Sequence, residues 1–242
     1  MPRQSIDIQG FGHVNPIPAA TRIGPLVVEY IDFITMSAIL RDRGLDLGVP
    51  DTIKSDALAY LVLVLEERRD HRLDENVEEL ATLVGDFGAL DVYVLPPQAG
   101  AQLIDAREKA FFTAKAAGAN DIIDMVVPRA SIAAYMAKVG ELAQASSSLV
   151  VGCGHAGDGN VHLSVFQRDP GVRHQLIHDL FAAGMALGGA ISGEHGIGTE
   201  KLRYLAELED PAKLSLMRRI KIAFDPHGIL NPGTIFDPEA TL

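Results

Sequence analysis

The sequence contains a single cysteine, Cys153, and no tryptophan. One cysteine cannot form a disulfide within the chain, so a disulfide-stapled fold is excluded and a reducing compartment, the cytoplasm, is expected. Long apolar runs are missing as well, because the longest one, Leu58–Leu65, is too short to span a bilayer. The N-terminus also lacks the charged-then-apolar pattern of a secretory signal.

Basic residues are scarce relative to acidic ones. Lys and Arg total 21 against 32 Asp and Glu, which gives a formal net charge of −11. Nucleic acids and anionic membranes require a basic surface, so neither is expected as the main partner. The 242 residues, 48% of them hydrophobic, are enough to bury a core, and a globular fold is therefore expected.

Short runs rich in β-branched or aromatic residues alternate with segments of helical spacing. We expect strands at 26–31, 57–65, 90–95, 121–127, 149–151 and 161–165, with a short one at 5–8. Helices are expected around 77–84, 103–111, 132–142 and 214–224. The runs 91–94 and 161–165 alternate as in a sheet covered on one face only. Together these patterns predict an α+β fold, a ferredoxin-like sandwich with a mainly antiparallel sheet covered by helices.

Three regions are expected along the chain. Residues 1–24 form an irregular N-terminal segment, 25–209 the α+β domain, and 210–242 a helix followed by an extended tail, because Pro and Gly punctuate 225–233. The apolar tail residues Ile229, Leu230, Ile235 and Phe236 need a surface to pack against.

Two glycine-rich segments carry the chemistry, GHAGDGNVH at 154–162 and SGEHGIGTEK at 192–201. Glycines permit turns that a Cβ forbids, and such loops commonly hold functional groups. His155, His162 and Glu194 offer two imidazoles and a carboxylate, a set that suits zinc, manganese or iron. The alternative is that one histidine only hydrogen-bonds its own turn, since eight histidines produce close pairs by chance.

Further polar residues are open to two interpretations each. His195 adjoins Glu194, and in an extended segment the two side chains point to opposite sides, so His195 would face a substrate as general base; it is otherwise an exposed loop histidine. Arg107, on an expected helix, is either a surface residue or a fork for a substrate carboxylate. Lys201 is either an anion contact or a solvated helix residue.

A literal G-x-G-x-x-G occurs at Gly152, Gly154 and Gly157. A dinucleotide site requires a helix to begin there, so that its N-terminus meets the pyrophosphate. Residues 158–163 instead predict a turn into a second strand, which argues against nucleotide binding at this position.

The segments GHAGDGNVH, SGEHGIGTEK and FDPHGILNPG, in this order, resemble the C-terminal domain of FAD-linked oxidases. That group includes glycolate oxidase, D-lactate dehydrogenase and D-2-hydroxyglutarate dehydrogenase. The segment PLVVEYID is similar to the family's first cap strand, so the likeness covers most of the chain. It implies an α+β cap, or substrate domain, set over FAD that is held by a separate flavin-binding domain or subunit.

The resemblance also implies roles for individual residues. The family's divalent-metal ligands, for zinc or manganese, correspond to His155, His162 and Glu194, and its active-site base to His195. Arg107 resembles the arginine that grips the substrate carboxylate, although Ile104 stands where the family has tryptophan. Asn231 resembles a residue near the flavin, although Thr234 follows where the family has lysine.

The function implied is the substrate- and metal-binding portion of an FAD-dependent 2-hydroxy-acid dehydrogenase or oxidase. Ser164 stands where the hydroxyglutarate enzymes have asparagine, and no lysine near Asp124 in the sequence matches their substrate lysine, which favours glycolate or D-lactate. Residues 1–30 do not resemble a flavin-binding domain, so we expect the chain to be inactive without that partner. Two alternatives stay open: a stand-alone metal-dependent hydrolase, and a non-catalytic cap that binds a metabolite or a partner subunit.

Overall fold

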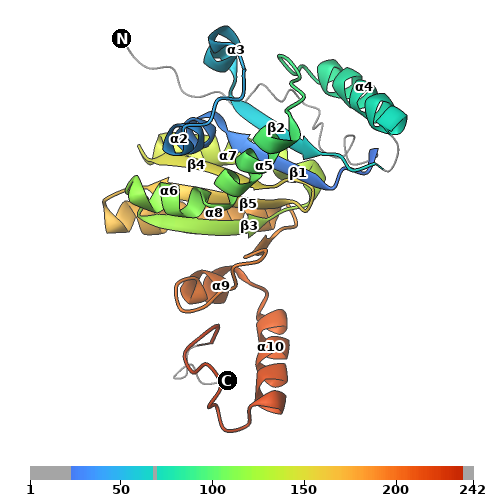
Figure 1. Cartoon of the computed structure of the whole chain (residues 1–242). Helices are drawn as coiled ribbons and strands as arrows, with labels where there is room; N and C mark the ends of the chain where they lie inside the picture. The colour runs from blue at the N-terminus through green and yellow to red at the C-terminus, as the bar shows by residue number, and fades with distance from the viewer. Residues whose placement is uncertain (1–22, 68–69, 237–242) are drawn as a thin grey trace.

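A computed structural model describes residues 23–67 and 70–236 (Figure 1). Within these residues one six-stranded sheet has the order β2-β1-β4-β5-β3-β6, and each recorded strand pairing is antiparallel. This confirms the α+β fold with an antiparallel sheet. The strands are β1 (Val27–Asp32), β2 (Ala59–Val64), β3 (Asp121–Val126), β4 (Leu149–His155), β5 (Asn160–Phe166) and β6 (Ala190–Ile191).

The second half of the domain is a ferredoxin-like unit. Its chain order is β3-α7-β4-β5-α8-β6, with α7 at Ile132–Ala145, after a short 3-10 turn (Arg129–Ser131), and α8 at Pro170–Ala186. The spatial order β4-β5-β3-β6 is that of the split β-α-β motif. Strands β1 and β2 extend the sheet beyond β4, so that β2 and β6 are its two edges.

Helices cover both faces of the sheet. Helices α7 and α8 pack on the first face, where Leu163 and Phe181 are fully buried. On the second face lie α2 (Phe33–Arg43), α5 (Pro97–Glu108) and α6 (Ala110–Ala116), with Ile31 and Leu103 at the centre of a smaller apolar cluster. The expectation of one covered face is therefore wrong. The alternation that suggested it arises because the second face carries polar side chains, as the site below shows.

The expected strand at 90–95 does not form. This segment links α4 (Asp70–Asp86) to α5 without strand pairing, and Leu90, Val92 and Val94 are exposed. Local β-propensity was not enough, because the segment does not join the sheet and its apolar side chains are not buried against a neighbouring strand. The other predicted strands correspond to β1 to β5, while the one expected at 5–8 lies outside the described residues.

The C-terminal elements extend away from the sheet (Figure 1). Helix α9 (Leu202–Leu208) packs on α8 through Tyr204, whose ring lies 5.4 Å from that of Phe181. Helix α10 (Pro211–Phe224) buries only Leu214. Phe224 and Ile229 are 83% and 74% exposed, so this end of the chain presents apolar surface.

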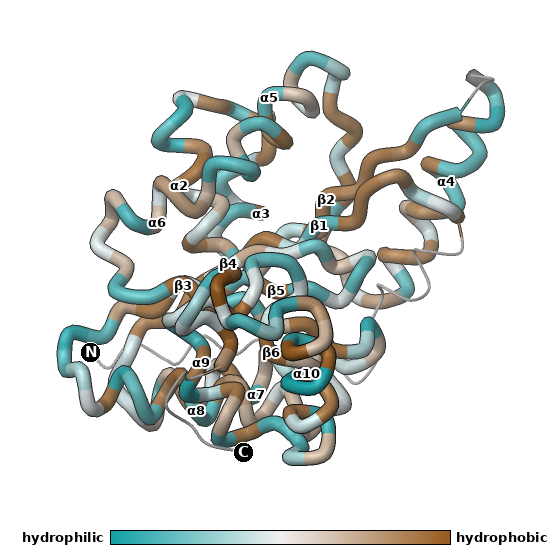
Figure 2. Tube along the Cα trace, turned by 90° about the horizontal axis from the view of Figure 1, so that it is seen from below, coloured by the Kyte–Doolittle hydropathy of each residue, from teal (hydrophilic) through white to brown (hydrophobic). Residues whose placement is uncertain are grey.

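Hydropathy follows the same organisation. In Figure 2 the trace is mostly hydrophobic along β1 and β2 and mostly hydrophilic along α4 at the periphery. Helix α3 (Asp51–Asp56) has no buried residue, whereas α4 buries Leu80 and Val84. None of the helices in the described ranges is long and apolar enough to cross a membrane.

The β4–β5 turn depends on Gly159. Its φ is +81°, and a Cβ there would lie 2.1 Å from the carbonyl oxygen of Val127. We expect Gly159→Ala to lower the free energy of unfolding by about 2–4 kcal/mol, from left-handed strain plus overpacking. The control is Gly85→Ala in α4, where a Cβ meets open space and helix propensity improves by about 1 kcal/mol. Urea unfolding measures both, and equal stability of the two variants would contradict this account.

Candidate metal and catalytic site

Strand register brings the two glycine-rich segments together. His162 lies on β5 directly opposite Asp124 of β3. Strand β6 pairs with the same β3 at Met125 and Val126, on its other side. The chain leaving β6 therefore passes Asp124, and Ser192 N donates to the Asp124 carbonyl at 3.1 Å. Residues 162 and 192–195, thirty positions apart in sequence, meet across a single strand.

The buried Asp124 carboxylate fixes the loop that follows β6. It accepts hydrogen bonds from the Ser192 hydroxyl (2.9 Å) and from the backbone N–H groups of Gly193 (3.0 Å), Glu194 (3.0 Å) and His195 (2.7 Å). Successive N–H groups converging on an anion form a nest. Burial alone would raise the pKa of Asp124, but these donors outweigh it and lower that pKa to about 2.

The turn places Glu194 and His195 on the same side. His195 Nε2 lies 3.8 Å from Glu194 Oε1, and the His195 ring stacks on that of His162 at 4.8 Å. The expectation that the two side chains point to opposite sides is therefore wrong. It assumed an extended strand, whereas Ser192 has a φ of 68° and all three following N–H groups turn toward Asp124.

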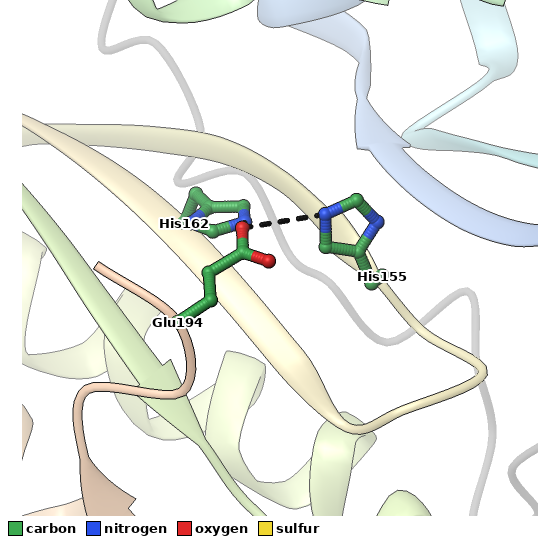
Figure 3. A group of neighbouring side chains, drawn as sticks. All are labelled: His155, His162 and Glu194. Carbon is green, nitrogen blue, oxygen red and sulfur yellow. Dashed lines mark ion pairs between the residues drawn. The ribbon is translucent and has the colours of Figure 1, made fainter. Parts of the chain in front are cut away.

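His155, His162 and Glu194 converge, as Figure 3 shows, with one donor atom from each within 4.8 Å of the others. Glu194 Oε1 lies 3.0 Å from His162 Nε2 and 3.4 Å from His155 Nε2. Ligands of a tetrahedral ion with bonds of about 2.0–2.2 Å are about 3.4 Å apart, so the spacing fits a divalent metal. Burial holds the pKa of His162 well below its usual range, which keeps a lone pair available for coordination.

Two further residues complete the surroundings of His155. Glu29 pairs with His155 across β1 and β4, and His155 Nδ1 donates to Glu29 Oε1 at 2.6 Å. This hydrogen bond raises the pKa of His155. Arg107, at the end of α5, is only 9% exposed, and its Nε lies 2.6 Å from Glu29 Oε2. The surface interpretation of Arg107 is therefore wrong.

Lys201 lies buried beside the cluster, whereas Asn231 is exposed in the C-terminal segment. Lys201 is buried, donates to the Gly196 carbonyl at 3.2 Å, and lies 4.0 Å from Asp124 Oδ2. It is not a solvated helix residue, and burial lowers its pKa. Asn231 is exposed in the turn after α10, where its carbonyl accepts from Thr234. Among the described residues Asn231 makes no hydrogen bond or ion pair to the cluster, although the tail contacts the loop after β6 where Ile235 N donates to the Gly198 carbonyl at 3.0 Å.

Sequence reasoning missed Glu29 and Asp124. Each is an acidic residue in the interior of an apolar strand. Glu29 is 5% exposed and Asp124 is 0% exposed. A lone carboxylate flanked by apolar residues on a predicted strand was the available signal, because such a group is buried only with partners.

The Asp124 nest predicts a pH-dependent stability. The folded-state pKa of about 2 lies below the ordinary 3.8, so the stabilisation is present above about pH 4 and is lost as pH falls toward 2. We expect Asp124→Asn to cost about 2 kcal/mol at pH 7 and progressively less toward pH 2. Chemical unfolding across this range measures it, with exposed Asp86→Asn as control. A penalty that stays constant down to pH 2 would contradict the nest.

The sequence is similar to those of known proteins over most of its length. The sequence model of the family described as FAD linked oxidases, C-terminal domain, matches residues 13–235. An uncharacterized FAD-linked oxidoreductase of Mycobacterium tuberculosis is 51% identical over 217 residues, covering 90% of this chain and 47% of that protein. The D-lactate dehydrogenase of Archaeoglobus fulgidus is 35% identical over 225 residues, with the same two coverages.

Solved structures share the fold. The 4-ethylphenol oxidase of Gulosibacter chungangensis, in its isoeugenol complex, superimposes with a TM-score of 0.61 at 15% identity, over 96% of this chain and 52% of that one. The chain thus spans about half the length of the relatives it matches. Because the family model matches residues 13–235, nearly the whole of this chain, the chain belongs to the C-terminal domains of FAD-linked oxidases.

Proposed function

We propose that this chain is the substrate- and metal-binding portion of an FAD-dependent dehydrogenase or oxidase of 2-hydroxy acids. The observation that carries the proposal is the convergence of His155, His162 and Glu194, with His195 stacked beside them. Three donors with further coordination positions open leave room for a substrate oxygen. Family membership supports the flavin, which a domain or subunit outside the residues matched here would hold.

The chain's own residues would have two roles, metal binding and proton transfer. His155, His162 and Glu194 would hold a divalent ion, zinc or manganese, and such an ion supplies Lewis acidity that favours loss of the substrate's hydroxyl proton. His195, whose side chain is 43% exposed, would accept that proton as general base. The flavin of this family, held by its own domain or subunit, would supply the redox chemistry by accepting the hydride from C2. A 2-hydroxy acid thus becomes a 2-oxo acid, with the proton on the His195 imidazole.

Substrate and flavin contacts are the finer part of the proposal. The remaining guanidinium N–H groups of Arg107, next to His155, suit a substrate carboxylate. Lys201 carries a second positive charge near the same loop. Asn231 and the exposed apolar residues of α10 and the tail would face the flavin-binding part. The high exposure of Phe224 (83%) and Ile229 (74%) supports this, because exposed apolar surface is typical of a contact surface.

The substrate we propose is small, of the glycolate or D-lactate type. One relative bears the name D-lactate dehydrogenase. Ser164, two residues after His162 on the same face of β5, is buried and offers one hydroxyl. This residue is shorter than the asparagine of the hydroxyglutarate enzymes, which favours a substrate without a second carboxylate.

The metal prediction is tested by His155→Ala. Loss of one of three ligands is expected to lower zinc content, measured by elemental analysis after loading and desalting, from near one equivalent to well below half. His71→Ala is the control, because His71 is exposed on α4. Undiminished zinc in the His155 variant would count against the ligand set.

The catalytic prediction concerns His195→Asn in the enzyme assembled with its flavin-binding part. We expect turnover of D-lactate or glycolate to fall by roughly 10²–10⁴, the usual scale of general base catalysis, while zinc content is unchanged. His174→Asn on α8 is the control. Turnover equal to that of the unmodified enzyme would remove His195 from this role, and hydrolytic activity without flavin would favour a metal-dependent hydrolase instead.

A further inference from the structure

Glu29 occupies an unusual place for a carboxylate. It lies in the middle of β1, is 5% exposed, and faces the same side of the sheet as the metal-ligand cluster. A buried carboxylate is costly unless charged and hydrogen-bonding partners surround it. Glu29 has one of each: its Oε1 accepts from His155 and its Oε2 contacts Arg107.

The contact with His155 determines which ring nitrogen is free. His155 Nδ1 lies 2.6 Å from Glu29 Oε1, and Nε2 lies on the Glu194 side, 3.4 Å from Oε1 of that residue. An imidazole that donates from Nδ1 to a carboxylate carries its lone pair on Nε2. A carboxylate in this position also orients the ring and makes the ligating nitrogen more basic.

Arg107 belongs to the same unit. Its Nε is 2.6 Å from Glu29 Oε2, which supplies the opposite charge beside the buried carboxylate. Its Nη2 is 3.4 Å from His155 Nδ1 and 3.5 Å from Nε2. Because the two distances are nearly equal, this guanidinium nitrogen does not point at one ring nitrogen alone. Arg107 therefore contacts both Glu29 and His155.

We propose that Glu29 is a positioning residue for the metal site: it fixes the tautomer and orientation of His155, and Arg107 holds it in place. This inference rests on the proposed function, because it presumes an ion on His155, His162 and Glu194. It adds to that function a second role for Arg107, distinct from contact with a substrate carboxylate. The competing explanation is that Glu29 only balances the charge of the buried Arg107.

The test is zinc affinity of the full 242-residue chain, measured by competition with a chromophoric chelator. We expect Glu29→Gln to raise the zinc Kd about 10- to 100-fold, the usual effect of removing such a partner of a ligating histidine. The matched control is Glu79→Gln on α4, an exposed glutamate, with an expected change below about twofold. Unchanged zinc affinity in the Glu29 variant would overturn the proposal.

A double variant separates positioning from charge balance. Glu29→Gln combined with Arg107→Met removes the buried pair together, so neither charge is left unpaired and folding is preserved even if the single variant is unstable. If Glu29 acts through His155, the double variant keeps the weakened zinc affinity. Return to the affinity of the unmodified chain would overturn the positioning role in favour of charge balance.

His155→Ala, measured in the same assay, distinguishes this inference from the proposed function. Loss of zinc binding in that variant, together with normal binding in Glu29→Gln, would leave the metal site standing and remove only the role of Glu29. Unchanged binding in both variants would contradict the metal site itself. Weakened binding in both, with the Glu79 control unaffected, is the result we expect.

Discussion

A buried carboxylate on β3 is the interaction on which the site depends. Asp124 accepts four hydrogen bonds from the loop after β6, three of them from consecutive backbone N–H groups. The same residue stands opposite His162 in the β3–β5 register. The loop is therefore tied to a fixed position on the strand that neighbours the histidine. Without this anchor Glu194 and His195 would belong to a glycine-rich loop of no defined path, and their approach to His162 would cost conformational entropy.

The second support comes from the opposite side of the cluster. Glu29 and Arg107 hold His155, as Asp124 holds the loop of Glu194 and His195. Both carboxylates lie on the sheet face covered by α2, α5 and α6. His155 and the backbone of the Glu194 loop are thus each held by a carboxylate on a neighbouring strand. Such preorganisation allows a bound ion and a substrate to be held without rearrangement of the chain.

The sequence predicted much of the fold, since period-two runs and helical spacing are local signals. Five of the expected strands were right, and the ligand set His155, His162 and Glu194 is brought together as the glycine-rich segments suggested. What failed depended on pairing and burial. The run 90–95 has strand propensity but does not pair, Glu194 and His195 turn to one side because of Asp124, and Arg107 is buried beside Glu29. None of these long-range contacts produces a repeating hydrophobic pattern in the sequence, so the local signals could not predict them.

The central claim is that two histidines on neighbouring strands, β4 and β5, and a glutamate in the loop after β6 bind one ion. The most direct measurement is a crystal structure of the zinc-loaded chain with data collected on both sides of the zinc absorption edge. The account predicts one anomalous peak about 2.0–2.2 Å from His155 Nε2, His162 Nε2 and a Glu194 carboxylate oxygen. A zinc peak at other histidines, with these three side chains apart, would contradict it.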